Sequence, residues 1–332
     1  MRLVQLDGRR GRRLAVAQEP ILQLLEGCAS VYDLAQTCIA TGRPLGAEIG
    51  ARLSDETVDY DEACAGNSEW RILPSADHPY EPARCLVSGT GLTHMASAKN
   101  RQAMHAKEEE LTDSMRMYRW GLEGGKPSAG SIGRPPEWFY KGDGSILRAY
   151  NEPLEVPAYA EDGGEEPEIA AVYLIDPAGA PRRIGFTTGN EFSDHEFERR
   201  NYLYLAASKL LTCSIGPELA IGADFSSVPG EVSIERNGTT VWRSQIRSGE
   251  SSMSHSLANL EHHHFKFAAH RRPGDLHIHF LGADAFSFGE GIRLQHGDVM
   301  QARFEGFGRP LRNPLERRLA PNELVRVEPL PV

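Results

Sequence analysis

Two carboxylates, placed two positions apart at the start of an apolar run, are the side chains best placed to do chemistry. Glu166 and Glu168 follow a Gly-Gly turn, and residues 169–176 after them have the composition of a β-strand. Side chains alternate along a strand, so both carboxylates are expected on the same face. Such a pair near a core is tolerable if one carboxylate is protonated or if a cation lies between them. Ligation by oxygen alone suits a hard ion such as Mg²⁺, Mn²⁺ or Ca²⁺. The alternative is that the two glutamates lie at the solvated start of a strand, in an acidic loop, and bind no cation.

A third acidic residue, Glu191, is predicted to return to the same place. Residues 183–188 have the composition of a strand that follows a turn at residues 176–179. The resulting hairpin would carry Glu191 back towards Glu166 and Glu168. The sequence therefore indicates one site with three carboxylates.

Lys209 stands alone in an otherwise apolar run, residues 202–211. A buried lysine is costly unless it is paired with an acid or works as a base in its neutral form. Lys209 is therefore a candidate catalytic residue beside the three carboxylates.

The order of these elements resembles the fumarylacetoacetate hydrolase (FAH) superfamily. The shared order is Glu-x-Glu at 166–168, Gly-Asn-acid-x-Ser at 189–193, the lysine in its apolar run, and Ser-Ile-Gly-Pro at 214–217. Phe-Tyr-Lys-Gly at 139–142 resembles the superfamily's aromatic-Lys substrate strand. Residues 297–299, 304–308 and 311–314 resemble its C-terminal strands. The resemblance covers about residues 85–315 and implies a mixed α/β, β-rich fold, with an FAH-like mixed β-sheet roll.

The resemblance also implies roles for individual residues. It places a divalent cation, Mg²⁺ first and Mn²⁺ or Ca²⁺ as alternatives, on Glu166, Glu168 and Glu191, although the third ligand is usually aspartate. Lys209 matches the superfamily's lysine, and His195 stands where its members carry an arginine. Substrate contacts are expected from Lys141 and from the loop at Gly282 and Ala283.

One departure from the superfamily's pattern bears on the reaction. Its carbon–carbon bond hydrolases carry Gly-Leu-Asn-Tyr-x-x-His, whereas residues 91–97 here read Gly-Leu-Thr-His-Met-Ala-Ser. Ser97 stands at the position of the water-activating histidine, and the chain resembles the branch of 2-keto-3-deoxy-sugar-acid dehydratases, of the L-arabinonate-pathway type. In another register His94 would be the base, and the enzyme would hydrolyse 2,4-diketo acids. A decarboxylase or tautomerase and a non-catalytic sugar-acid-binding protein are further alternatives.

The chemistry expected of the dehydratase begins at the ketone of the substrate. The cation would polarise the C2 ketone and acidify the protons on C3. Lys209 would remove one of them to give an enolate, and the C4 hydroxyl would then leave, with Ser97 as a weaker candidate to handle it. From 2-keto-3-deoxy-arabinonate the product would be 2-oxoglutarate semialdehyde.

Composition narrows the partners and the organisation of the chain. The 332 residues carry a net charge of −10, which argues against nucleic acid, and no apolar run is long enough for a membrane span. Five cysteines without paired metal spacing suggest a reduced, cytoplasmic protein. We expect a small N-terminal α/β domain over residues 1–80 and an FAH-like catalytic domain over residues 81–332. The expected partners are a small-molecule 2-keto acid and, from the resemblance, a second copy in a homodimer.

Overall fold

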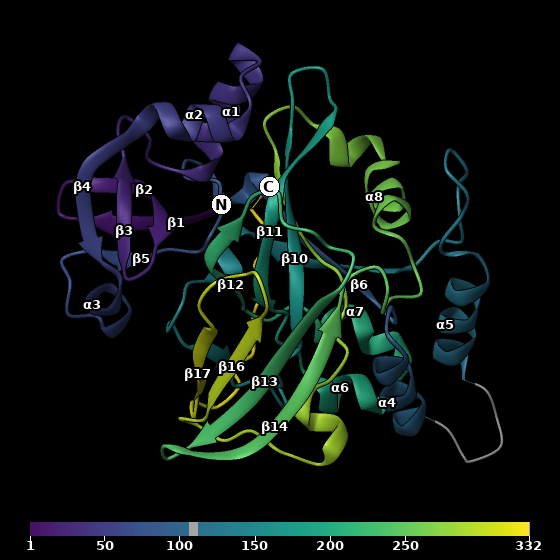
Figure 1. The fold of residues 1–332 in the computed structure, drawn as a ribbon. Helices are drawn as coiled ribbons and strands as arrows, with labels where there is room; N and C mark the ends of the chain where they lie inside the picture. Colours follow the sequence, from purple (N-terminus) through teal and green to yellow (C-terminus); the bar gives the residue numbers. More distant parts are fainter. Residues whose placement is uncertain (106–111, 332) are drawn as a thin grey trace.

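The structure is a computed structural model that describes residues 1–105 and 112–331. A long mixed sheet runs through the molecule, with a smaller sheet packed on one face and helices at both ends (Figure 1). The larger sheet has the order β4-β3-β2-β1-β12-β11-β10-β15-β6-β7, with β5 beside β1 and β8 beside β12. The smaller sheet has the order β14-β13-β16-β17-β9. The fold class predicted from the sequence, a β-rich mixed α/β roll, is confirmed.

The strands have the following bounds: β1 Arg2–Gly8, β2 Gly11–Gln18, β3 Ile21–Leu25, β4 Leu53–Asp59, β5 Arg71–Ile72, β6 Cys85–Gly91, β7 Glu137–Asp143, β8 Leu147–Arg148, β9 Leu154–Val156, β10 Pro167–Ile175, β11 Pro181–Asn190, β12 Cys213–Ala220, β13 Val228–Arg236, β14 Thr239–Ser248, β15 Leu276–Phe280, β16 Val299–Phe304 and β17 Leu311–Arg317. The α-helices are α1 Val31–Thr41, α2 Leu45–Arg52, α3 Tyr60–Ala65, α4 Met95–His105, α5 Asp113–Gly124, α6 His195–Arg200, α7 Leu205–Ser208 and α8 Leu257–Phe265. Short 3₁₀ helices are η1 Pro82–Arg84, η2 Gly144–Ile146, η3 Tyr202–Tyr204, η4 Ala268–Arg271 and η5 Ser287–Glu290.

Strand β10 lies at the centre of the packing, and all of its residues are buried. Its odd-numbered apolar residues, such as Ile169 and Tyr173, pack with the smaller sheet in one core. Its even-numbered residues, such as Ala170 and Val172, belong to a second core that includes helix α1. The apolar run was predicted to be a strand covered on both faces, and the structure confirms this.

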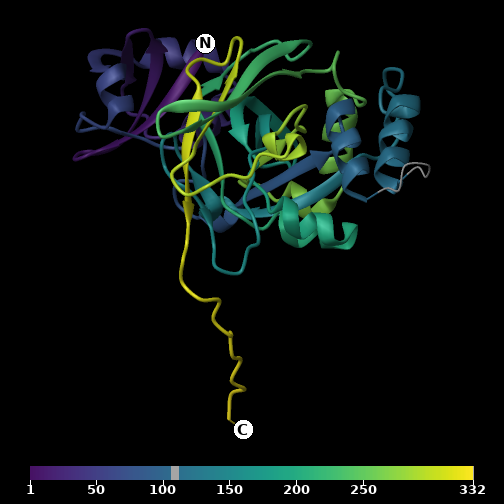
Figure 2. The same ribbon diagram turned by 90° about the horizontal axis from the view of Figure 1, so that it is seen from below.

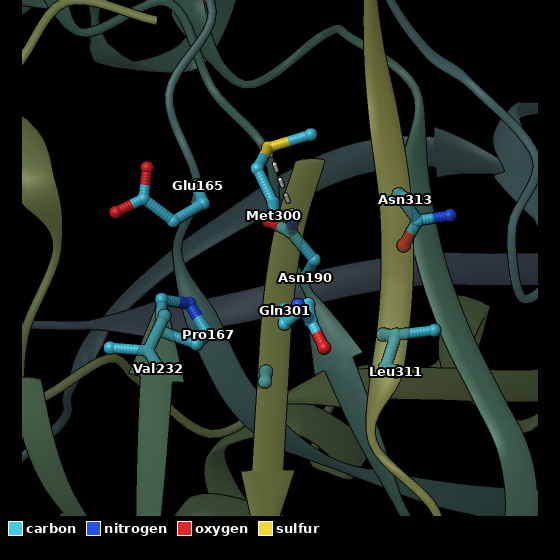
Figure 3. Close-up of a pocket in the computed structure, with 9 residues that line it drawn as sticks. Glu165, Pro167, Asn190, Val232, Met300, Gln301, Leu311 and Asn313 are labelled. Carbon is cyan, nitrogen blue, oxygen red and sulfur yellow. Dashed lines mark hydrogen bonds between the residues drawn. The ribbon is translucent and has the colours of Figure 1, made fainter. Parts of the chain in front are cut away.

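The two sheets are closely packed where β10 begins. Figure 3 shows the contact, with Pro167 and Asn190 from the larger sheet facing Val232 and Met300 from the smaller one. The Asn190 amide donates to the sulfur of Met300 at 3.6 Å. The cavity left between them is about 10 Å³, which is room for no more than about one water molecule. The start of β10 is therefore held firmly from this side.

The first 80 residues form the strands and helices at one end of the molecule (Figure 1). Their strand β1 pairs with β12, so the larger sheet continues from this part into the rest of the chain. A third core, which includes Leu22, Val58 and Tyr60, lies within this part. We keep residues 1–80 as a proposed domain, joined to residues 81–332 by main-chain hydrogen bonds.

Two further segments lie outside the two sheets. A single helix is predicted over about residues 99–120, but Thr112 caps a separate helix α5 by accepting from the amide of Met115. Residues 106–111, in the middle of that prediction, lie outside the described residues. Beyond β17, residues 318–331 run away from the body of the molecule without regular structure (Figure 2). Among the described residues, no helix is both long and apolar enough to cross a membrane.

Candidate functional site

The hairpin β10–β11 brings the three acidic residues together. The strands pair antiparallel, with Glu168 opposite Gly189 and Pro167 opposite Asn190. Just beyond the paired ends, the amide of Glu191 donates to the carbonyl of Glu166 at 2.9 Å. The predicted hairpin is thus present, and it returns Glu191 to the start of β10.

The carboxylates of Glu166, Glu168 and Glu191 form one cluster. Each offers an oxygen, and these oxygens all lie within 4.8 Å of one another. Glu168 and Glu191 are 2% and 0% exposed, so water does little to separate their charges. Glu168 accepts a hydrogen bond from the backbone amide of Gly282 at 2.6 Å, which is a neutral donor. Burial, and then the charges of Glu191 and Glu166, raise the pKa of Glu168 well above its usual range.

This donor set fits a hard divalent cation. Three close carboxylate oxygens are the ligands that Mg²⁺ and Mn²⁺ take in proteins. Burial, and then the charges of Glu191 and Glu166, make the ionised form of Glu168 costly, and no lysine or arginine pairs with this carboxylate among the ion pairs of the described residues. A divalent cation would favour the ionised form, so the residues present are suited to such an ion.

Lys209 lies inside the cluster and not in an apolar setting, which corrects the expectation from its sequence neighbours. Its ammonium nitrogen Nζ donates to Glu166 Oε1, to Glu191 Oε2 at 2.6 Å and to Ser193 Oγ at 3.1 Å. It also lies 4.8 Å from the centre of the Phe139 ring. The lysine is therefore in hydrogen-bond contact with two of the three carboxylates.

Lys141 was predicted to contact the substrate, but the structure gives it a different place. The side chain is fully buried and pairs with Glu191 Oε1 at 2.7 Å. Its Nζ also donates to the carbonyls of Phe192 at 2.7 Å and Lys209 at 2.8 Å. These three acceptors match the three donors of an ammonium group. Lys141 thus holds Glu191 and the backbone around it, and it faces protein rather than the cavity.

His195 is a member of the site to which sequence reasoning assigned no clear role. Asp194 caps helix α6, and His195 is its first residue. The ring nitrogen Nε2 lies 3.0 Å from Glu166 Oε1. Burial lowers the pKa of His195, but the hydrogen bond and charge of Glu166 outweigh it and raise the pKa above its ordinary value. Burial alone would raise the pKa of Glu166, but the charges and hydrogen bonds of Lys209 and His195 hold that pKa well below its usual range.

A cavity opens beside the carboxylates, and several predicted residues line it. Its lining residues are Gly91, Leu92, Ser97, Glu166, Glu168, His195, Glu198, Ala283 and Phe286. Ser97 and Ala283 therefore share the cavity with two of the acidic residues. The cavity is about 20 Å³, so a sugar acid would enter only if part of this wall moved. Glu198, one turn after His195 on α6, was missed because acidic residues on a short helix usually face solvent.

His94 and Gly282 are placed differently from the predictions. His94 is buried with Nδ1 2.9 Å from Thr93 Oγ1, and it is not among the residues that line the cavity. Burial lowers the pKa of His94 to about 4. The amide of Gly282 was expected to hold a substrate carboxylate, but it is bonded to Glu168. Gly282 has φ of +102°, and an added Cβ would lie 1.8 Å from Thr93 Oγ1, so the turn requires glycine.

Comparisons with known proteins agree with this geometry at the level of the fold. The chain matches no protein-family model. A Haloferax volcanii protein named "Probable 2-keto-3-deoxyxylonate dehydratase" is 28% identical over 179 residues, which are 52% of this chain. The match spans only 58% of that relative's length.

Solved structures with similar folds cover almost the whole chain. One of 2-keto-3-deoxyarabinonate dehydratase has a TM-score of 0.71 at 19% identity and covers 96% of this chain and 100% of its own. Another, of 2-keto-3-deoxy-D-arabinonate dehydratase complexed with magnesium and 2,5-dioxopentanoate, has a TM-score of 0.70 at 18% identity and covers 96% and 99%. A 5-carboxymethyl-2-hydroxymuconate delta-isomerase from Mycobacterium smegmatis has a TM-score of 0.59 at 17% identity and covers 96% and 100%. The resemblance to the FAH superfamily seen in the sequence is thus confirmed as a shared fold.

Proposed function

We propose that this protein is a metal-dependent hydro-lyase that removes water from a 2-keto-3-deoxy sugar acid. The observation that carries the proposal is the cluster of Glu166, Glu168 and Glu191 with the Lys209 ammonium between two of them. Ser97 and His195 line the cavity beside that cluster. The names of the relative and of two structural neighbours support the same class of reaction. The substrate we propose is 2-keto-3-deoxy-arabinonate or a close analogue, with 2-oxoglutarate semialdehyde as the product.

Glu166, Glu168 and Glu191 would hold the divalent cation, for which we propose Mg²⁺, with Mn²⁺ or Ca²⁺ as substitutes. When bound, such an ion polarises a ketone oxygen and makes the adjacent C–H more acidic. The protein's own contribution is to keep three carboxylates together in a buried place. Lys141 does this for Glu191, and the Gly282 amide does it for Glu168.

We assign the proton transfers to Lys209 and His195. Lys209 would take the C3 proton at Nζ as a neutral amine, so its ammonium group, which contacts Glu166 and Glu191, would first release one proton to solvent. His195 lines the cavity, its raised pKa favours the protonated ring, and it would donate a proton to the departing C4 hydroxyl. Ser97 would orient that hydroxyl, and Ala283 would contact the substrate from the loop after β15.

The alternative hydrolase needs His94 as a base that activates water. His94 is buried away from the cavity lining, and its lowered pKa makes the ring a weak base. Dehydration is therefore the better-supported reaction. A binding protein without activity would keep the fold and the carboxylates but would not consume its ligand.

The test is a panel of substrates incubated with purified protein and Mg²⁺, followed by mass spectrometry. Loss of one water from a 2-keto-3-deoxy acid, abolished by EDTA, is the expected result. Cleavage of 2,4-diketo acids into two acids would show the hydrolase instead, and binding without turnover would show a binding protein. The homodimer and the cytoplasmic location stay predictions.

A further inference from the structure

Glu165 stands next to the carboxylate cluster in the sequence but points to the other face of the chain. Figure 3 shows it beside Pro167, with its carboxylate directed away from Asn313 and Leu311. The side chain is 1% exposed, so its charge must be satisfied inside the protein. Its Oε1 accepts from the amide of Ser287 at 2.5 Å, and its Oε2 accepts from the Ser287 hydroxyl at 2.9 Å.

Ser287 belongs to the connection between β15 and β16, residues 281–298, which forms part of the cavity wall. The residues on either side of it, Phe286 and Phe288, both pack against the ring of His195. Their ring centres lie 5.2 and 4.9 Å from the centre of the imidazole. Phe286 also lines the cavity. The bonds from Glu165 to Ser287 therefore fix two aromatic rings that hold His195.

His195 depends on this packing because little else holds its ring. The ring nitrogen Nε2 is bonded to Glu166. The other ring nitrogen, Nδ1, has no hydrogen-bond partner among the described residues. Gly164 leaves the space that the ring occupies, since an added Cβ there would lie 2.4 Å from Nδ1. A small rotation of the ring would break its bond to Glu166, whose carboxylate also accepts from Lys209. The position of His195 thus affects both the cluster and the cavity.

We propose that Glu165 is a positioning residue for this site. By binding Ser287 it holds Phe286 and Phe288 on His195, and through His195 it fixes the carboxylate of Glu166. This deepens the proposed function and rests on it for the kinetic effects, while the effects on the loop and on metal binding do not require any turnover. Glu165 itself is neither part of the cluster nor among the residues that line the cavity beside it.

The test compares Glu165→Gln with a control that removes a similar charge elsewhere. Glu218 is also buried, and it also accepts from one backbone amide, that of Arg309, and one hydroxyl, that of Tyr60, both at 3.0 Å. Glu218 also pairs with Arg2 at 3.0 Å, and Glu218→Gln therefore removes a buried carboxylate charge outside the cluster and its cavity. Three quantities are measured for each variant: amide hydrogen exchange in residues 283–291, Mn²⁺ affinity by calorimetry, and kcat and KM for the substrate found by the panel.

For Glu165→Gln we expect exchange in residues 283–291 to accelerate about tenfold, because glutamine keeps only one acceptor oxygen and its bonds to Ser287 are no longer strengthened by charge. Mn²⁺ affinity is expected to fall about tenfold, as it does when a partner of a metal ligand is removed. The value of kcat is expected to fall about tenfold with a smaller change in KM, because proton transfer depends on position. Glu218→Gln is expected to change thermal stability only.

Ser287 provides a second pair of variants if Glu165→Gln does not fold. Ser287→Ala removes the hydroxyl and is expected to show the same changes to a lesser degree, whereas Ser287→Thr keeps both donors and is expected to resemble the wild type. The proposal is wrong if the Glu165 or Ser287→Ala variant is destabilised while loop exchange and Mn²⁺ affinity stay at wild-type values. If the wild type dehydrates no keto acid, the proposed function fails, but loop exchange and Mn²⁺ affinity still decide the role of Glu165.

Discussion

Metal binding to the carboxylate cluster should be linked to the release of a proton from Glu168. Burial and the neighbouring charges of Glu191 and Glu166 raise the pKa of Glu168, so without a cation this side chain keeps its proton to a higher pH than a free carboxyl group does. A metal ligand must be deprotonated, so each ion bound displaces that proton. While Glu168 is still protonated, the release of one proton per ion makes the apparent Kd for the metal fall about tenfold for each unit by which the pH rises. This corresponds to about 1.4 kcal/mol of binding free energy.

The perturbation is Glu168→Gln, which keeps the size of the side chain but has no proton to release. Burial also raises the pKa of Glu191, and His195 contacts Glu166, so either of these groups can release a proton on metal binding in both proteins. The difference between the two proteins measures the proton that Glu168 adds. We expect the pH dependence of log Kd in Glu168→Gln to be shallower than in the wild type, by up to about one decade per pH unit.

The assay is calorimetric titration with Mn²⁺ between pH 6 and pH 8, in buffers of different ionisation enthalpy. The buffer dependence of the measured heat gives the number of protons released. Glu218→Gln is the control, since burial raises the pKa of Glu218 too but that residue lies outside the cluster. Equal proton release by wild type and Glu168→Gln would refute the reasoning, because Glu168 would then not be a titrating ligand.

Three further predictions follow from the buried charges. Lys209→Met should slow the exchange of C3 protons of a bound keto acid with deuterated solvent by about 10²–10⁴-fold, followed by NMR, and unchanged exchange would remove Lys209 as the base. Glu191→Gln should lower the free energy of unfolding in urea by about 3–5 kcal/mol, because Lys141 and Lys209 lose a buried partner; a loss below about 1 kcal/mol would contradict this. Burial, and then neighbouring histidines, lower the pKa of His277 and of His279 to about 3, so below pH 6.5 the unfolded chain binds more protons and stability should fall on acidification. His279→Gln should remove up to about 1.4 kcal/mol per pH unit of that fall, and an unchanged slope would show that His279 is not buried in its neutral form.

The parts of the site that follow from strand geometry were predictable. Alternation along β10 places Glu166 and Glu168 on one face, and the turn before β11 brings Glu191 back to them. The same alternation places Glu165 on the opposite face, but nothing in the sequence indicates its partner, Ser287, which lies 122 positions away. Local periodicity specifies the direction of a side chain and not what it meets.

The surroundings of Lys209 could not be predicted for the same reason. Its neighbours in the sequence are apolar, but its neighbours in space are carboxylates supplied by another hairpin. Lys141 was assigned to the substrate because its strand resembles a substrate strand, whereas its burial against Glu191 depends on how β7 and the segment after β11 meet. His195 carried one signal, its position four residues after Glu191 behind a helix cap, and that signal does not specify contact with Glu166.

The join between the first 80 residues and the rest of the chain was also beyond local patterns. Strands β1 and β2 pair through a short turn, but β1 also pairs with β12, more than 200 positions later. Pairing over such a distance is decided by which buried faces fit, and strand periodicity contains no information about it.

The central claim is that Glu166, Glu168 and Glu191 hold one divalent cation. Crystals grown with Mn²⁺, with diffraction data collected at the manganese absorption edge, test this most directly. The prediction is a single anomalous peak within about 2.0–2.6 Å of a carboxylate oxygen from each of the three residues, the range of oxygen–cation bonds. No peak at the cluster at saturating Mn²⁺, or a peak that Glu168 does not reach, would contradict it.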